Sequence, residues 1–377
     1  MTTKALHDSS EETDRELAAV RSEIETADRD LVAAAARRVR LGRREADLRR
    51  QIQRPAVDFA YERSVLEGVR DWSSSLGLDP VVAEDLVSRV FEASLELQEA
   101  DDLRHAGTGA GSRAVVVGGG GRMGRWMRGF LEAQGYSVAA LDPCLEAADN
   151  ERAEEWLPEA DLVLCAAPPR AVAEIYERWA EAPPQGVVAD LASIKAPLLG
   201  SLGRLQEAGG RVASFHPMFG PSKVLLRGAD VLICETGDTA ATVVVEALFR
   251  PTAARLVRVG LTEHDQLMAD LLGLAHAAAI AFAAALPEAD HPVRSTTFQA
   301  LEDLAAKVVQ ESPDVYYEIQ AHNPHSLAAL EKLRRAVAAL ERAVREERPD
   351  AFRRLMELGR RRTSAVSCHW DGEVVDR

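Results

Sequence analysis

The sequence predicts an α/β protein flanked by all-α parts: an N-terminal helical domain, a doubly wound sheet domain and a C-terminal helical domain. Three observations support this order. Residues 15–53 are rich in Ala, Leu, Arg and Glu and contain no proline. Short apolar runs then alternate with helical stretches from 113 to 259, and the pattern from 261 to 370 is helical again. Strands and helices that alternate at this spacing are typical of crossover units in a mostly parallel sheet.

The N-terminal helical domain is predicted over residues 13–100. Its first helix is longer than usual for a globular protein, so it needs partner helices to pack against. This helix ends before Pro55, which cannot continue the helical hydrogen bonds, and Asp79-Pro80 marks a later helix start. A Gly-rich polar linker follows the domain. The predicted helices and linker are 15–53, 59–75, 80–98 and 101–112.

The sheet domain is predicted over 113–260 and the C-terminal helical domain over 261–372. The predicted strands are 113–119, 137–142, 162–167, 186–192, 211–217, 231–235 and 254–259. In the C-terminal domain, the apolar segment 271–286 is too short for a membrane span, and we expect a buried helix there. Segment 326–344 has an apolar face that suits a two-fold dimer.

The composition is typical of a soluble globular protein, with 47% hydrophobic and 28% charged residues. The net charge of −15 argues against a nucleic-acid or anionic-membrane surface. The four cysteines form no CxxC pair, so we expect neither disulfides nor a metal site. The polar N-terminus has no secretory apolar region, which favours a cytoplasmic protein.

A glycine motif follows the first predicted strand. AVVVGGGGRMG contains G-x-G-x-x-G at Gly119, Gly121 and Gly124, and the second strand ends at Asp142. The glycines let the backbone approach a pyrophosphate at a helix N-terminus. A carboxylate at Asp142 suits a ribose 2′-hydroxyl and repels a 2′-phosphate, so NAD is favoured over NADP, although Arg122 and Arg125 could soften that preference. The predicted cofactor-binding residues are Gly119, Gly121, Arg122, Met123, Gly124 and Asp142.

Four motifs occur in a particular order: GGGGRMG, VADLASIK, SFHPMFGPS and EHDQLMA. With them, the chain resembles the prephenate dehydrogenase family, and residues 15–370 resemble its bifunctional form, in which a chorismate mutase precedes the dehydrogenase. The resemblance implies that His216 binds the substrate's C4 hydroxyl and accepts its proton while the C4 hydride passes to NAD. Decarboxylation then gives an aromatic product. His216 ends the fifth predicted strand, where ligands of doubly wound sheets bind.

Other dehydrogenase residues are expected around His216. Ser193 ends the fourth predicted strand and is expected to bind the same oxygen or orient the imidazole, which makes it the second catalytic candidate. Lys195 is expected to support the nicotinamide side or the loop, and His264 to cap a helix or line the cleft; both are substrate-binding candidates. The resemblance places His276 at a substrate carboxylate.

In the N-terminal domain, a charged cage is expected to hold a dicarboxylate and to stabilise charge on an ether oxygen. Arg38 and Arg49 are 11 residues apart and share one helix face, whereas Arg21 points elsewhere and suits a partner protomer's site. The resemblance implies a mutase site made by Arg21, Arg38, Arg49, Asp58, Glu62, Ser94 and Gln98. Two positions depart from the family pattern: Arg49 replaces a lysine, and Tyr61 replaces an arginine. A purely dimerising or solvated helix face is the alternative.

The C-terminal domain also departs from the family, because Gln299 stands where an arginine binds a substrate carboxylate. Arg294 lies nearby and could compensate. One cation fewer better matches a substrate with an amino group at C4, so 4-amino-4-deoxyprephenate is slightly favoured over prephenate.

The expected partners are therefore NAD, a small dicarboxylate substrate and a second copy of the chain. Two alternatives remain at this stage. One is another NAD-linked dehydrogenase, such as one acting on a 2-hydroxy or branched acid, which would leave the N-terminal helices unexplained. The other is a catalytically silent NAD sensor whose N-terminal helices only dimerise.

Overall fold

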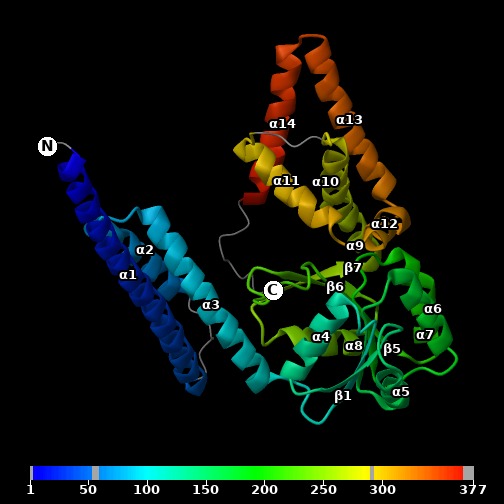
Figure 1. The fold of residues 1–377 in the computed structure, drawn as a ribbon. Coiled ribbons are helices and arrows are strands. Elements are labelled where there is room, and N and C mark those ends of the chain that lie inside the picture. Colours follow the sequence, from blue (N-terminus) through cyan, green and yellow to red (C-terminus); the bar gives the residue numbers. More distant parts are fainter. Residues whose placement is uncertain (1–2, 53–58, 289–292, 368–377) are drawn as a thin grey trace.

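The computed structural model describes residues 3–52, 59–288 and 293–367. The three predicted parts follow one another along the chain, and the two helical parts project from the sheet domain (Figure 1). Asp58 of the predicted mutase site lies outside the described residues, as does the side chain of Glu62.

Three helices form the N-terminal part. They are α1 (Thr3–Gln51), α2 (Phe59–Leu76) and α3 (Pro80–Ala106). As predicted, Pro80 begins α3, and the carboxylate of Asp79 caps it by accepting a hydrogen bond from the Val81 amide at 2.8 Å. Helix α3 packs against both α1 and α2, and its C-terminal end reaches the sheet domain (Figure 1).

The linker begins later than predicted. Helix α3 continues to Ala106, so only residues 107–112 connect it to the sheet. A Cβ at Gly107 would lie 2.5 Å from the Gln134 carbonyl oxygen, and one at Gly109 would lie 2.1 Å from the Tyr136 ring. The glycines therefore permit close packing here, and α3 is fixed to the sheet domain rather than tethered by a loose chain.

The seven predicted strands are all present, in one sheet of order β2-β1-β3-β4-β5-β6-β7. The β5–β6 pair is antiparallel and the other neighbouring pairs are parallel, so β6 and β7 run opposite to β1–β5. The strands are β1 (Arg113–Val117), β2 (Ser137–Leu141), β3 (Leu162–Cys165), β4 (Val187–Asp190), β5 (Arg211–Pro217), β6 (Asp230–Glu235) and β7 (Arg255–Gly260). The inner strands are apolar at nearly every position because helices cover both faces.

Helices α4 (Arg122–Ala133) and α8 (Thr239–Phe249) pack on one face of the sheet. Helices α5 (Ala147–Trp156), α6 (Pro169–Trp179) and α7 (Leu199–Glu207) pack on the other. This doubly wound arrangement puts the carboxyl ends of β1, β3, β4 and β5 at one edge, where the glycine loop and His216 both lie.

The C-terminal part is helical, as predicted (Figure 1). Its elements are α9 (Leu261–Met268), the π-helical turn η3 (Ala269–Gly273), α10 (Leu274–Ala285), α11 (Thr296–Val309), α12 (Pro313–His322), α13 (Ser326–Arg345) and α14 (Pro349–Ser367). The first three join into one helical stretch, Leu261–Ala285, which by length and composition alone could cross a membrane. Only 22% of its most apolar window is buried within this chain, so the prediction of a buried helix at 271–286 was wrong for a single chain.

Candidate functional site

A row of hydrogen bonds runs through the interior from His216 at the end of β5. Its Nδ1 lies 3.0 Å from Nε2 of His264, whose Nδ1 lies 2.8 Å from a carboxylate oxygen of Asp265. All three residues are buried. Asp265 also accepts hydrogen bonds from the backbone amides of Lys195 and Ala196 at 2.7 and 2.6 Å. We call His216, His264 and Asp265 the relay.

The partners of Asp265 determine the tautomers in the relay. A carboxylate that accepts two amide hydrogen bonds also accepts from Nδ1–H of His264. Neutral His264 then offers Nε2 as an acceptor, so His216 donates from Nδ1–H. The Nε2 of His216 is left with its lone pair, and it has no hydrogen-bond partner among the described residues. This geometry prepares His216 to act as a base through Nε2.

The electrostatic surroundings also keep His216 neutral. Burial lowers its pKa well below the ordinary value, and His264 and Lys195 add to that effect. Burial likewise lowers the pKa of His264, although its hydrogen bond to Asp265 opposes this. A neutral imidazole is the form that can accept a proton.

Lys195 and His264 are both fully buried, and their expected role at the substrate stays a prediction. The Lys195 ammonium donates to Asp190 at 2.7 Å and to the carbonyl oxygen of Phe215 at 2.8 Å. It therefore joins the end of β4 to the residue before His216. These two contacts hold the backbone next to His216 in place.

Ser193 lies half-buried in the turn between Asp190 and Lys195, beside the relay. It has no hydrogen bond to His216 among the described contacts, so its catalytic role stays a prediction. His276 on α10 packs against the ring of Tyr316 with centroids 4.4 Å apart. Its buried Nδ1 has no hydrogen-bond partner in the described part of the chain, and its role at a substrate carboxylate stays a prediction.

The remaining two predicted substrate residues lie at α11. Gln299 is exposed, and only its backbone makes a described hydrogen bond, from its amide to Ser295. Arg294 forms an ion pair with Glu302 at 3.2 Å. The structure therefore places neither of them in contact with the relay.

The glycine loop fits a dinucleotide. A Cβ at Gly124 would lie 2.0 Å from the Gly118 carbonyl oxygen, so only glycine lets the first turn of α4 lie against the loop. Asp142 accepts a hydrogen bond from the Gly120 amide at 3.0 Å, which puts its carboxylate beside the loop. The half-buried Met123 side chain packs against the core, and its role at the cofactor stays a prediction. Arg122 is paired with Glu311 of the C-terminal part.

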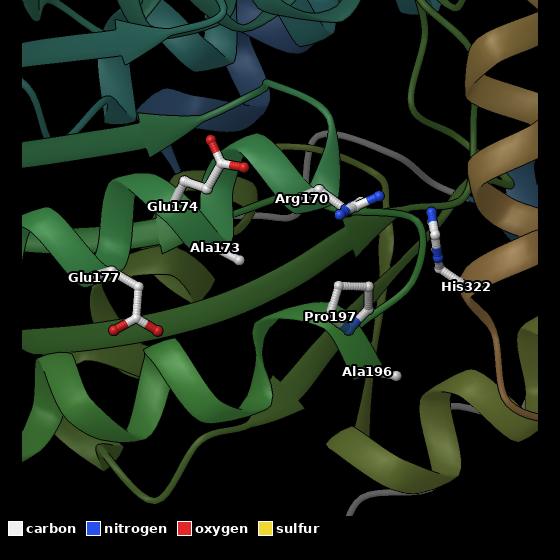
Figure 2. Close-up of a pocket in the computed structure, with 7 residues that line it drawn as sticks. All are labelled: Arg170, Ala173, Glu174, Glu177, Ala196, Pro197 and His322. Carbon is white, nitrogen blue, oxygen red and sulfur yellow. The ribbon is translucent and has the colours of Figure 1, made fainter.

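A cavity of about 630 Å³ lies beside this site, between α6 and the turn after Lys195. Figure 2 shows Arg170 and His322 turned toward one another across it, with Glu174 and Glu177 along α6. None of the predicted catalytic residues lines it. Asn323, the residue after His322, donates to the carbonyl oxygen of Asp265 at 2.7 Å. The end of α12 therefore contacts the relay.

In the N-terminal part, three predicted mutase residues meet at Gly42 of α1. A Cβ there would lie 2.1 Å from Oγ of Ser94, 3.0 Å from a guanidinium nitrogen of Arg38 and 3.3 Å from Nε2 of Gln98. Gln98 donates to the Gly42 carbonyl oxygen at 2.9 Å. Oγ of Ser94 is buried with no hydrogen-bond partner among the described residues.

The other mutase residues are less closely gathered. Arg49 pairs with Glu45 at 3.3 Å on α1. Arg21 is exposed and lies 17 residues before Arg38, which is about 25 Å along the helix axis. Arg21 therefore cannot reach the Gly42 cluster of its own chain. Tyr61, at a position where the family has arginine, is exposed.

Sequence reasoning missed Asp265, Asp190 and Asn323 as parts of the site. Asp265 stands next to His264 in EHDQ, and Asp190 lies in VADLASIK, so the quoted motifs contained both. Asn323 gave no signal, because its contact with Asp265 depends on how α12 packs.

The fold and site define an NAD-dependent dehydrogenase with a helical domain in front. Three family models match: chorismate mutase type II over residues 20–99, the prephenate dehydrogenase nucleotide-binding domain over 132–258 and the prephenate dehydrogenase dimerisation domain over 261–358. The chain belongs to the prephenate dehydrogenase family, in the bifunctional form that also carries a chorismate mutase domain.

Individual relatives agree. The T-protein of Enterobacter agglomerans is 26% identical, over 90% of this chain and 92% of its own. The 4-amino-4-deoxyprephenate dehydrogenase of Streptomyces pristinaespiralis is 32% identical, over 64% of this chain and 87% of its own. Among solved structures, a prephenate dehydrogenase from A. aeolicus in complex with hydroxyphenyl propionate and NAD+ shares the fold. Its TM-score is 0.54 at 18% identity, and the match covers 67% of this chain and 98% of that one.

Proposed function

We propose that the dehydrogenase oxidises 4-amino-4-deoxyprephenate to 4-aminophenylpyruvate, with loss of carbon dioxide. The observation that carries this choice is the neutral Gln299 at the position where the family resemblance expects an arginine. An amide in place of a guanidinium loses a charge-assisted contact of about 1.5–3 kcal/mol with a carboxylate. A substrate with an amino group at C4 supplies positive charge of its own and needs one protein cation less.

The position of Arg294 supports this proposal. Its guanidinium is paired with Glu302 at 3.2 Å, so its charge is already balanced within the chain. To replace the missing arginine, it would have to leave that carboxylate. The relative that is 32% identical, a 4-amino-4-deoxyprephenate dehydrogenase, points to the same substrate.

The relay supplies the chemistry. NAD, when bound at the glycine loop, is the hydride acceptor. Nε2 of His216 takes a proton from the C4 ammonium, the C4–H bond gives its electron pair as hydride, and an iminium forms at C4. The bond from C1 to its carboxylate then breaks, carbon dioxide leaves, and the electron pair moves into the ring to give the aromatic amine. Asp265 and His264 keep the His216 proton on Nδ1.

Prephenate is the second candidate, because the T-protein relative matches over 90% of this chain, including the mutase part. The purified chain with NAD and each substrate distinguishes the two through kcat/KM, measured from NADH absorbance. A tenfold or greater preference for prephenate contradicts the proposal. Gln299→Arg is expected to shift the ratio toward prephenate by about tenfold, since it restores the charged contact. Gln310→Arg, which adds the same charge at the exposed end of α11, serves as the matched control.

For the N-terminal part, we propose that Arg38, Ser94 and Gln98, with Arg49, Asp58, Glu62 and the partner's Arg21, bind a chorismate-type substrate and catalyse its rearrangement. The convergence of three of these side chains at Gly42 supports this. Mass spectrometry after incubation with NAD and either chorismate or its 4-amino analogue tests both activities at once. If neither starting compound is consumed, the mutase proposal fails.

We propose that the chain acts as a homodimer in the cytoplasm. The segment that matches the dimerisation domain exposes large apolar side chains, including Leu327, Val337, Leu340 and Val344 of α13. An exposed apolar surface of this kind is typical of a site that another protein chain covers. Light scattering coupled to gel filtration measures the mass directly, and a monomer at micromolar concentration contradicts the proposal.

A further inference from the structure

Helix α3 serves two domains at once. Ser94 and Gln98 face Gly42 in the mutase part. The next residue, Glu99, faces the sheet domain, where its carboxylate accepts hydrogen bonds from the Leu226 amide at 2.7 Å and the Ala253 amide at 2.8 Å. One turn later, Leu103 belongs to the core of the sheet domain.

Glu99 binds the loop that follows the catalytic strand. This β5–β6 loop, residues 218–229, begins two residues after His216. It is anchored to the nucleotide helix α4, because Nε1 of Trp126 donates to the Lys223 carbonyl oxygen at 2.8 Å. Its second anchor is Glu99, at Leu226. The loop thus connects the base, the nucleotide helix and a mutase-domain helix.

Glu99 contributes to the junction between α3 and the β5–β6 loop. Cavities of about 590 and 540 Å³ are both lined by α3 together with this loop, and Glu99 lines the second. Leu226 of the loop is buried in the same core cluster as Leu103 of α3. Glu99 is buried, and burial raises its pKa while its two amide hydrogen bonds oppose that rise. A buried carboxylate that loses these bonds is costly, so the pairing is strongly preferred.

We propose that Glu99 is a positioning residue for the dehydrogenase reaction. From the mutase-domain helix it fixes the β5–β6 loop, and through that loop the alignment of His216 with the nucleotide at α4. This inference rests on the dehydrogenase activity proposed above but not on which substrate is preferred. It makes the mutase helix a structural part of the dehydrogenase site.

The test uses the full-length chain with Glu99→Gln, in which one of the two acceptor oxygens becomes an amide donor that faces a backbone N–H. The matched control is Glu96→Gln, which removes the same charge from an exposed position one turn earlier on α3. We expect Glu99→Gln to lower the dehydrogenase kcat about tenfold, with the KM for NAD changed by less than about twofold. Glu96→Gln should leave both within twofold. Hydrogen–deuterium exchange should accelerate in residues 218–229 and stay slow in β1 to β4.

Two outcomes overturn the proposal. One is an unchanged kcat in Glu99→Gln, even if exchange in the β5–β6 loop accelerates, because the loop then does not align the base. The other is a loss of kcat with faster exchange throughout the sheet, because Glu99 then supports folding only. Each variant is compared with the wild-type chain on the same substrate. The ratio of variant to wild-type kcat can therefore be interpreted whichever substrate the wild-type chain prefers. A failure of the substrate proposal would be seen in the wild-type chain alone.

Discussion

The dehydrogenase and mutase parts of this chain differ in how much of each site one chain supplies. In the dehydrogenase part, His216, His264 and Asp265 are buried and joined to one another within a single chain. In the mutase part, three side chains meet at Gly42, but Arg21 lies about 25 Å from Arg38 along α1 and is exposed.

The difference follows from the architecture. Parallel strands bring their carboxyl ends to one edge, so residues distant in sequence meet there without help from a second chain. A long helix instead spreads its residues along its axis, and a cage of charges around a dicarboxylate needs a partner helix to close it. The dehydrogenase part should therefore respond to substitutions within one chain, and the mutase part to the pairing of chains.

The largest effect is expected from His216→Asn, which removes the base from the self-contained site. Loss of a general base lowers the rate by about 10²–10⁴-fold, and we expect the dehydrogenase kcat to fall near the upper end. NAD binding, followed by fluorescence titration, should persist, and the mutase rate should stay within twofold. Undiminished oxidation by this variant contradicts the assignment of His216.

Asp265→Asn should have the next largest effect, because it acts on the proton positions and not on the base itself. In either orientation the amide NH2 faces a backbone N–H, of Lys195 or of Ala196. In the orientation in which it donates to Nδ1 of His264, both tautomers reverse and a proton lies on Nε2 of His216. We expect a loss of about 10²–10³-fold in dehydrogenase kcat, within the range for misplaced general bases. Asp270→Asn, a neighbouring carboxylate paired with Lys332 on the surface, is the control. Equal effects of the two substitutions would remove the relay from the mechanism.

A mixing experiment addresses the mutase part. Arg21→Ala and Arg38→Ala should each abolish mutase activity in a homodimer. In a mixed dimer, one site combines the intact Arg38 of one chain with the intact Arg21 of the other. Statistical mixing gives half mixed dimers with one intact site each, so about a quarter of the wild-type rate should return. No recovery after subunit exchange would show that Arg21 acts within its own chain or not at all.

Features of the fold and the site could be predicted from the sequence where the residues that determine them lie close together in the chain. The glycine loop, the strands and His216 were predicted because motif and period lie within short segments. The burial of Lys195 and His264 could not be predicted, because it depends on contacts between distant segments: the Lys195 amide donates to Asp265, and His264 contacts His216. The extension of α3 to Ala106, into the predicted linker, was missed for a similar reason. Its last turns are stabilised by contacts with the sheet domain, such as those of Leu103, which no local pattern encodes.

A smaller difference between the two parts is expected in how their rates depend on pH. Because burial, His264 and Lys195 lower the pKa of His216 below 6.5, its neutral form persists as the pH falls. The dehydrogenase kcat/KM should therefore stay level down to pH 6.5 and decline only below it. The free energy of unfolding should also decrease below that pH, because His216 binds a proton in the unfolded chain but stays neutral in the folded one. Mutase rates in the same buffers report any general inactivation, and a half-maximal dehydrogenase rate above pH 6.5 contradicts the assignment.

The smallest effect is expected from Gly42→Ala, which touches only the mutase cluster. The new Cβ would meet Oγ of Ser94 at 2.1 Å and the Arg38 guanidinium at 3.0 Å, and both are ends of rotatable side chains. They can move aside, so we expect a few-fold loss of mutase kcat/KM and no change in dehydrogenase rate. Alanine stabilises a helix interior by about 0.5–1 kcal/mol relative to glycine, which should offset the crowding in thermal unfolding. Gly203→Ala in α7, where a Cβ has open space, should show that stabilisation alone. If Gly42→Ala also leaves the mutase unaffected, the side chains at Gly42 do not form its site, and the contrast between the two parts loses its basis.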